Sequence, residues 1–186
     1  MSAEIKIVFT GTVGAGKTTA IASVSDRPPV ATDALATDDT GALKPTTTVA
    51  LDYGEMRLPD GDKLRLYGTP GQHRFRFMWE ILAKGALGFV ILVDNTRPSP
   101  LEDLAGYLDN FGPWIERSAA VVGVTHGEYC RGPDLEQYHE FISRREAAHP
   151  VMFTDPRQPR HVITLMDTLL AALEFSTASA DGAPET

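Results

Sequence analysis

The residues with the clearest chemical meaning lie near the N-terminus, where positions 11–18 read Gly-Thr-Val-Gly-Ala-Gly-Lys-Thr. This run matches the phosphate-binding pattern G-x-x-x-x-G-K-[ST]. Glycines let the backbone wrap closely around phosphate oxygens with its N–H groups pointing inward. Lys17 is expected to reach the β- and γ-phosphates, and the Thr18 hydroxyl is expected to bind Mg²⁺. The candidate phosphate-binding residues are Gly11, Val13, Gly14, Ala15, Gly16, Lys17, Thr18 and Thr19.

The segments around this run have the required character. Residues 5–9 are rich in β-forming side chains, and a short helix is predicted over residues 17–24. A helix that begins at the lysine adds its positive N-terminal end to the phosphate site. The alternative is a glycine-rich turn that closes an ordinary strand–helix unit.

A second feature follows the predicted strand at residues 64–67, where Gly68-Thr69-Pro70-Gly71-Gln72 is succeeded by Arg-Phe and Met-Trp pairs. Together the two motifs resemble those of the bacterial Ras-like small GTPases. This group includes the gliding-polarity GTPases, the conservon-type ATP/GTP-binding proteins and relatives encoded beside roadblock-type partners. The likeness covers about residues 5–175.

The resemblance implies roles for three further residues. Gly71 would offer its N–H to the γ-phosphate, and Gln72 would orient the attacking water. Thr48 best matches the family's first switch threonine, which binds Mg²⁺ and the γ-phosphate. The implied catalytic residues are thus Gln72, Lys17 and Thr48, and the implied metal ligands are Thr18 and Thr48. The plainer alternatives are that Thr48 only starts a strand and that Gln72 is an inert exposed residue.

Two departures from the family pattern concern the metal and the base. Gly68 stands where the family has the aspartate of Asp-x-x-Gly-Gln, so Mg²⁺ binding is weakened or a carboxylate elsewhere takes over. Asp94, which ends an apolar run, is expected to be structural.

The guanine-reading Asn-Lys-x-Asp is replaced by Thr125-His126-Gly127-Glu128. The Glu128 carboxylate could accept both guanine N–H donors, whereas Thr125 cannot copy an asparagine amide. His126 is either part of the site or an ordinary loop residue. The last base loop is expected at Asp155, Pro156 and Arg157. Guanine therefore follows mainly from the resemblance, and adenine stays open.

Catalysis and partner binding are separate questions. Phosphoryl transfer benefits from a cation near the developing charge, but Lys44 is the single basic residue between Arg27 and Thr48. We therefore expect slow hydrolysis that a partner accelerates. Phe77 and Ile81 lie off the apolar stripe formed by Phe75, Met78, Trp79 and Leu82, and could form an exposed partner surface.

Strand-like and helix-like stretches alternate, which predicts an α/β fold. Its expected form is a Ras-like mixed six-stranded sheet with one antiparallel strand, flanked by helices. Residues 25–47 are expected to form a long loop, and Pro59-Asp60-Gly61 is expected to turn a hairpin. The other predicted strands are 87–94, 119–124 and 150–153, and the other predicted helices are 100–115, 135–148 and 162–175.

Composition narrows the classes of function. The chain of 186 residues carries a formal net charge of −8, which disfavours a nucleic-acid partner. Its one cysteine excludes an intrachain disulfide. No leader, lipidation motif or membrane span is recognised, so a cytoplasmic location without a direct membrane anchor is expected. One domain is expected over residues 1–175, with a flexible tail over residues 176–186.

These features together predict a small switch protein that binds GTP or GDP with Mg²⁺ and hydrolyses GTP slowly. Its output would be contact with a protein partner, such as a roadblock-type regulator. Two alternatives stay open: a pseudo-GTPase scaffold that binds nucleotide without useful turnover, and a P-loop ATPase with altered base specificity. A small P-loop kinase is less well supported, because the sequence has no arginine-rich lid segment.

Overall fold

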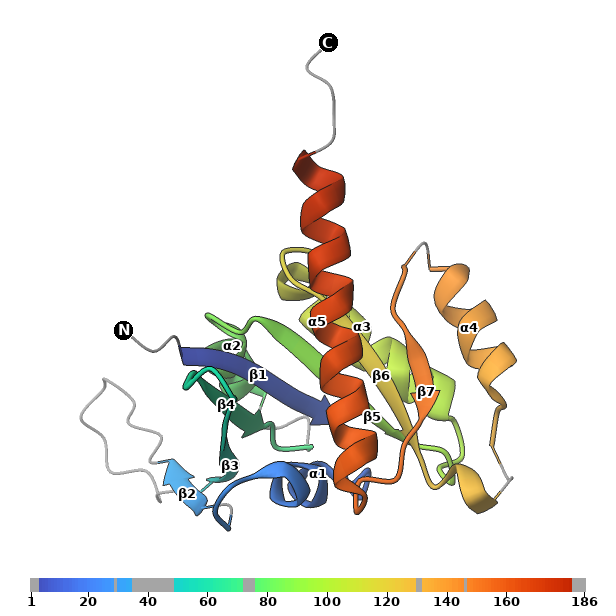
Figure 1. Cartoon of the computed structure of the whole chain (residues 1–186). Coiled ribbons are helices and arrows are strands. Elements are labelled where there is room, and N and C mark those ends of the chain that lie inside the picture. Colours follow the sequence, from blue (N-terminus) through green and yellow to red (C-terminus); the bar gives the residue numbers. More distant parts are fainter. Residues whose placement is uncertain are drawn as a thin grey trace, which may run out of the picture.

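One sheet organises the computed structural model, which describes residues 4–28, 30–34, 49–71, 76–129, 132–145 and 147–181. Its strand order is β2-β3-β4-β1-β5-β6-β7 (Figure 1). Every neighbouring pair is parallel except β2–β3 and β3–β4, so β3 alone runs against the others. The strand bounds are β1 Glu4–Gly11, β2 Val30–Ala34, β3 Val49–Arg57, β4 Lys63–Gly68, β5 Gly88–Asp94, β6 Ala120–Thr125 and β7 Val151–Phe153.

The α/β class and the single antiparallel strand are confirmed, but the described sheet has seven strands rather than six. The additional strand, β2, lies inside the segment predicted as a loop. Its residues pair antiparallel with β3, from Val30 opposite Tyr53 to Ala34 opposite Val49. A five-residue strand with Thr and Asp in its centre shows no clear periodicity, so its pairing partner decides its conformation.

Five α-helices cover the two faces of the sheet: α1 Lys17–Val24, α2 Arg76–Ala83, α3 Pro100–Ile115, α4 Leu135–Ser143 and α5 Pro159–Asp181. The bounds of α1 and α3 agree with the prediction, whereas α4 ends earlier. Helix α5 extends beyond Phe175 into the predicted tail.

Helix α4 begins with a capping box, in which Asp134 and Gln137 each bond to the other's backbone N–H. None of the described helices combines the length and apolar character needed to cross a bilayer.

Strand β5 shows how the two layers form. Phe89, Ile91 and Val93 pack in the cluster that contains Trp79 of α2 and Phe111 of α3. Val90 and Leu92 point to the opposite face and pack with residues of α1 and α5. This alternation buries β5 on both sides, as expected for a central parallel strand. Because β1, β4, β5 and β6 pair in parallel, their carboxyl ends lie at one edge of the sheet (Figure 1).

Candidate functional site

The phosphate-binding motif occupies the turn between β1 and α1. Gly16 stands directly before α1 with φ 90°, in the left-handed region that favours glycine. A Cβ at this position would lie 2.6 Å from Cγ of Pro156, the residue predicted in the last base loop. The two predicted loops therefore touch, and a side chain on Gly16 would push them apart.

Lys17 closes the loop from inside. Its Nζ donates hydrogen bonds to the carbonyl oxygens of Gly11, at 2.8 Å, and Thr12, at 2.7 Å. An ammonium has three donors, so one proton remains for a ligand. Burial lowers the pKa of Lys17 to about 8, and the nearby Asp52 carboxylate opposes that shift. The site thus holds a lysine whose pKa lies well below the ordinary lysine value.

Asp52 occupies the space left by the missing aspartate at position 68. Its Oδ2 accepts a 2.6 Å hydrogen bond from the Thr18 hydroxyl. Asp52 on β3 lies directly opposite Gly68 on β4. A Cβ on Gly68 would come within 2.8 Å of the Asp52 Cβ and 3.0 Å of its Oδ2. The carboxylate therefore comes from the neighbouring strand, and Gly68 provides the room for it.

The paired oxygens of Thr18 and Asp52 suit a hard cation such as Mg²⁺, which takes oxygen ligands and usually completes its shell with water and phosphate. The described residues contain no cluster of three His, Cys, Asp or Glu side chains that could hold a metal alone. The donor set thus fits a metal that arrives with a phosphate ligand better than an all-protein cage.

Gly71 approaches the phosphate loop more closely than a larger residue could. A Cβ there would lie 2.9 Å from the Val13 nitrogen and 3.1 Å from the Lys17 Nζ. Two side chains hold this segment: Trp79 donates a 3.0 Å hydrogen bond to the Pro70 carbonyl, and Tyr107 donates one of 3.4 Å to the Gly71 carbonyl. Gly71, Val13 and Lys17 therefore converge at one end of the loop.

A cavity of about 470 Å³ lies by the predicted base-contacting residues, lined by Gly127, Glu128, Phe153, Thr154, Asp155, Arg157 and His161. There, a terminal nitrogen of Arg157 lies 3.6 Å from Oε1 of Glu128. Arg157 also pairs with Asp155, and hydrogen bonds from Arg157 lower the pKa of that carboxyl. The buried Thr154 hydroxyl has no hydrogen-bond partner among the described residues. A buried hydroxyl of this kind indicates space for a polar ligand or water.

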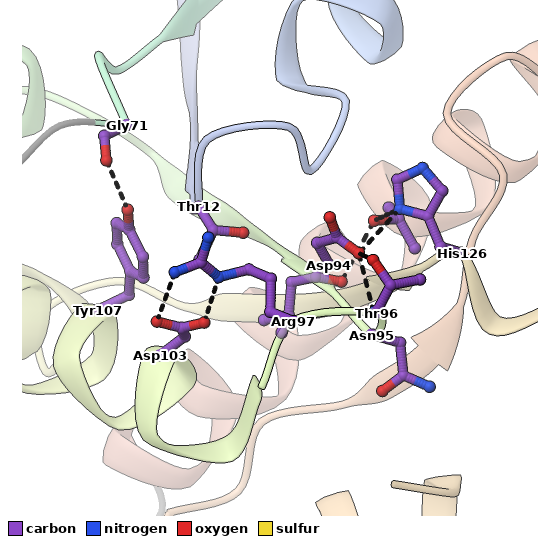
Figure 2. Close-up of polar contacts among 12 residues, drawn as sticks. Thr12, Gly71, Asp94, Asn95, Thr96, Arg97, Asp103, Tyr107 and His126 are labelled. Carbon is purple, nitrogen blue, oxygen red and sulfur yellow. Dashed lines mark hydrogen bonds and ion pairs between the residues drawn. The ribbon is translucent and has the colours of Figure 1, made fainter. Parts of the chain in front are cut away.

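His126 and Asp94 form a separate polar pair beside the loop (Figure 2). His126 has φ 58°, and its Nδ1 lies 3.1 Å from Asp94 Oδ1. Burial of Asp94 raises its pKa, but hydrogen bonds from Thr96 and the neighbouring His126 outweigh burial and lower the pKa overall. Asp94 thus bonds to residues that directly follow β5 and β6, and its structural role stays a prediction. Thr125 is fully buried, and its hydroxyl bonds to the Val93 carbonyl at 3.2 Å.

The predicted site residues Thr48 and Gln72 lie outside the described ranges, as do Lys44 and Phe75. Within the described ranges, Val13, Gly14, Ala15 and Thr19 lie on the loop or the first turn of α1. The sequence reasoning missed Asp52, Thr154 and Tyr107. Only the missing aspartate at position 68 gave a signal, because it implied that another carboxylate was needed.

The fold and this loop define a Ras-like P-loop nucleotide-binding architecture. The family described as "Conserved hypothetical ATP binding protein" matches residues 27–111. The uncharacterized protein MJ1339 of Methanocaldococcus jannaschii is 32% identical over 101 residues, 54% of this chain and 57% of that protein.

Ras-related proteins give more distant matches. Ras-related protein RABE1d of Arabidopsis thaliana is 27% identical over 110 residues, 57% of this chain and 45% of its own. Ras-related protein Rab-27B of Homo sapiens is 26% identical over 144 residues, 70% of this chain and 55% of its own. The chain spans about half the length of the curated relatives it matches. These matches support a distant relationship to the Ras-like P-loop GTPases.

Proposed function

We propose that this chain is a nucleotide-dependent switch that binds GTP and GDP with Mg²⁺ and hydrolyses GTP slowly. The observation that carries the proposal is the loop between β1 and α1, with Lys17 held across it and the Thr18 hydroxyl bonded to Asp52. Such an arrangement brings backbone N–H groups, a helix N-terminus and an ammonium to one loop, where they would bind phosphate.

The contacts at the two ends of the phosphate-binding loop indicate how the nucleotide would be oriented. Pro156 lies against Gly16, next to the cavity formed by Glu128, Phe153 and Arg157. Gly71 lies against Val13 at the other end. We place the base in the cavity, the phosphates over the loop, and the terminal phosphate beside Gly71.

Guanine is the proposed base because Glu128 could accept hydrogen bonds from both of its N–H donors. His126, Asp155, Pro156 and Arg157 complete the proposed base side of the site. Adenine is the competing candidate. It is favoured by the altered base loops and by the description of the family that matches residues 27–111 as ATP-binding.

Thr18 would bind Mg²⁺ on the phosphate side, together with Thr48 as the resemblance implies. The bound ion would neutralise phosphate charge during transfer. Asp52 would accept the hydrogen bond that the Thr18 hydroxyl donates and thereby turn the threonine oxygen toward the ion, a typical outer-shell role. Lys17 would hold the terminal phosphates, and Gln72 would orient water.

The signal would pass through the segments around Thr48 and Gln72, which the terminal phosphate would order and hydrolysis would release. Phe77 and Ile81, which are 49% and 62% exposed on α2, offer an apolar surface directly after Gln72. A roadblock-type regulator is the proposed partner. The competing class is a nucleotide-binding scaffold without useful turnover.

The first experiment identifies the nucleotide that copurifies with the protein, followed by GDP and ADP titrations with and without Mg²⁺. Guanine selectivity supports the switch, equal affinity supports an ATPase-like alternative, and binding of neither nucleotide overturns the proposal. Single-turnover hydrolysis is then compared with a Gln72→Ala variant. Equal rates would identify a scaffold, and fast turnover of the isolated protein would contradict its need for a partner.

A further inference from the structure

A second cavity, of about 290 Å³, lies on the phosphate side of the loop. Its lining residues are Thr12, Val13, Gly71, Arg97, Glu102, Asp103, Gly106 and Tyr107. Val13 and Gly71 are the residues that converge with Lys17 where we place the terminal phosphate. The cavity therefore borders the end of the loop at which phosphoryl transfer would occur, away from the base.

Arg97 is the one cationic side chain among the described residues that line this cavity. It follows β5, and Asp103 in the first turn of α3 holds it: Nε donates to Oδ2 at 2.5 Å and one terminal nitrogen donates to Oδ1 at 3.4 Å. In Figure 2 the guanidinium lies between Asp103 and Thr12. A guanidinium carries five N–H donors, so this pair leaves donors for another acceptor.

The same lining contains a buried polar group that bonds to none of the described residues. Thr12 is 4% exposed, and its hydroxyl has no hydrogen-bond partner among the described residues. A buried hydroxyl without a partner is unfavourable unless water or a ligand satisfies it. Glu102 adds a second carboxylate, and Tyr107 fixes the Gly71 carbonyl on the opposite side. The cavity is thus polar and faces the proposed reaction.

We propose that Arg97 is a built-in cation that contacts the terminal phosphate from this cavity, with Asp103 as its positioning residue. The inference rests on the proposed function. In the step, a water oxygen bonds to the γ-phosphorus while the bond to the β–γ bridging oxygen breaks. The electron pair of that bond stays on the nucleoside diphosphate, and the water's proton leaves with inorganic phosphate or solvent. Arg97 keeps its proton throughout and stabilises charge on the phosphate oxygens.

The test compares two variants that break the same ion pair. Arg97→Ala removes the cation, whereas Asp103→Ala removes its partner and leaves the cation in place. For each variant, diphosphate affinity, thermal unfolding and single-turnover hydrolysis of bound triphosphate are measured. We expect Arg97→Ala to slow hydrolysis by about 10- to 100-fold with unchanged diphosphate affinity. Asp103→Ala leaves the cation but removes its positioning partner, so it should slow hydrolysis clearly less than Arg97→Ala does. Arg97→Lys should restore part of the rate.

A second readout does not depend on turnover. Aluminium fluoride with bound diphosphate mimics the transferring phosphoryl group, so the wild type and Asp103→Ala should form this complex and Arg97→Ala should not. Equal loss of rate in the two alanine variants would mean that the ion pair is only structural and would overturn the inference. An unchanged rate in Arg97→Ala would overturn it too. Absence of nucleotide binding by the wild type would instead refute the proposed function itself.

Discussion

The Thr18 hydroxyl on α1 donates a 2.6 Å hydrogen bond to Asp52, which lies 34 positions further along the chain on β3. Asp52 stands opposite Gly68, and a Cβ on Gly68 would collide with it. A carboxylate was expected at position 68. Asp52 on the adjacent strand β3 supplies one instead, and it contacts the hydroxyl proposed to bind Mg²⁺.

This relationship predicts that Asp52→Asn weakens Mg²⁺-dependent nucleotide binding by about 10- to 100-fold, the usual cost of removing an outer-shell partner. The variant keeps the side-chain volume but loses the negative charge. Titration of the diphosphate over a range of Mg²⁺ concentrations measures the effect. The double variant Asp52→Gly with Gly68→Asp returns a carboxylate from the other strand and should recover binding. No loss in Asp52→Asn would remove Asp52 from the metal site.

The pKa of Lys17, lowered to about 8, predicts that nucleotide affinity falls as the pH rises above about 8. The free protein loses the ammonium charge there, so binding an anionic phosphate must restore it by taking up a proton. Titrations at several pH values, with a Lys17→Arg control that stays charged, measure this dependence. A flat profile in the wild type would contradict it.

The same shift has an opposite consequence for the ligand-free fold. In the unfolded chain Lys17 keeps its proton up to the ordinary lysine pKa of 10.5, whereas the folded protein releases it at a pKa of about 8. The unfolded state therefore binds more protons between these values, so this group's contribution to stability rises with pH across that window. Unfolding of nucleotide-free protein, compared with Lys17→Met, separates this contribution from other titrating groups.

Gly16 and Gly61 form a matched pair because both have φ near 90°, but only Gly16 has a neighbour in the way. Alanine at either site should cost about 1–2 kcal/mol of unfolding free energy from the left-handed backbone. Gly16→Ala should additionally push Pro156 away from the loop and reduce nucleotide affinity. Chemical denaturation and nucleotide titration measure the two effects. Equal nucleotide affinity in the two variants would show that the contact between Gly16 and Pro156 is unimportant for nucleotide binding.

Glu128→Ala should reduce the preference for guanine over adenine by about 10-fold or more, since one bidentate base contact contributes roughly 1–3 kcal/mol. IDP lacks the exocyclic amino group of GDP. The wild type should therefore bind IDP more weakly than GDP, whereas Glu128→Ala should bind the two about equally. Glu136→Ala, an exposed carboxylate on α4, is the control. If Glu128→Ala left the preference for guanine unchanged, residues other than Glu128 would recognise the base.

Phe77→Ala should weaken partner binding while leaving nucleotide affinity and stability nearly unchanged, because the side chain is 49% exposed. Its neighbour Met78 is 5% exposed in the core, so Met78→Ala should cost about 2–5 kcal/mol of unfolding free energy. Pull-down with a candidate roadblock-type protein, in each nucleotide state, measures the surface effect. A parallel loss of nucleotide affinity in Phe77→Ala would argue against a dedicated partner surface.

The sequence determined the parts of this protein that depend on consecutive residues. The motif at residues 11–18 needs only a strand before it and a helix after it, and α1 runs over the predicted range Lys17–Val24. Apolar runs similarly identified β5 and β6, because buried parallel strands need little besides hydrophobic side chains. The exposure of Phe77 and Ile81 also follows helical periodicity within one segment.

The tertiary structure decided which distant residues meet. The β3–β4 register places Asp52 opposite Gly68, and β2 exists as a strand because β3 offers it an edge. Arg97 lies in the same cavity as Thr12 because β5 lies beside β1, with Gly11 opposite Leu92. Its position relative to Thr12 and Gly71 depends on how α3 and the loop after β4 pack around one cavity. Such contacts depend on strand register and packing between elements, which a local pattern does not encode.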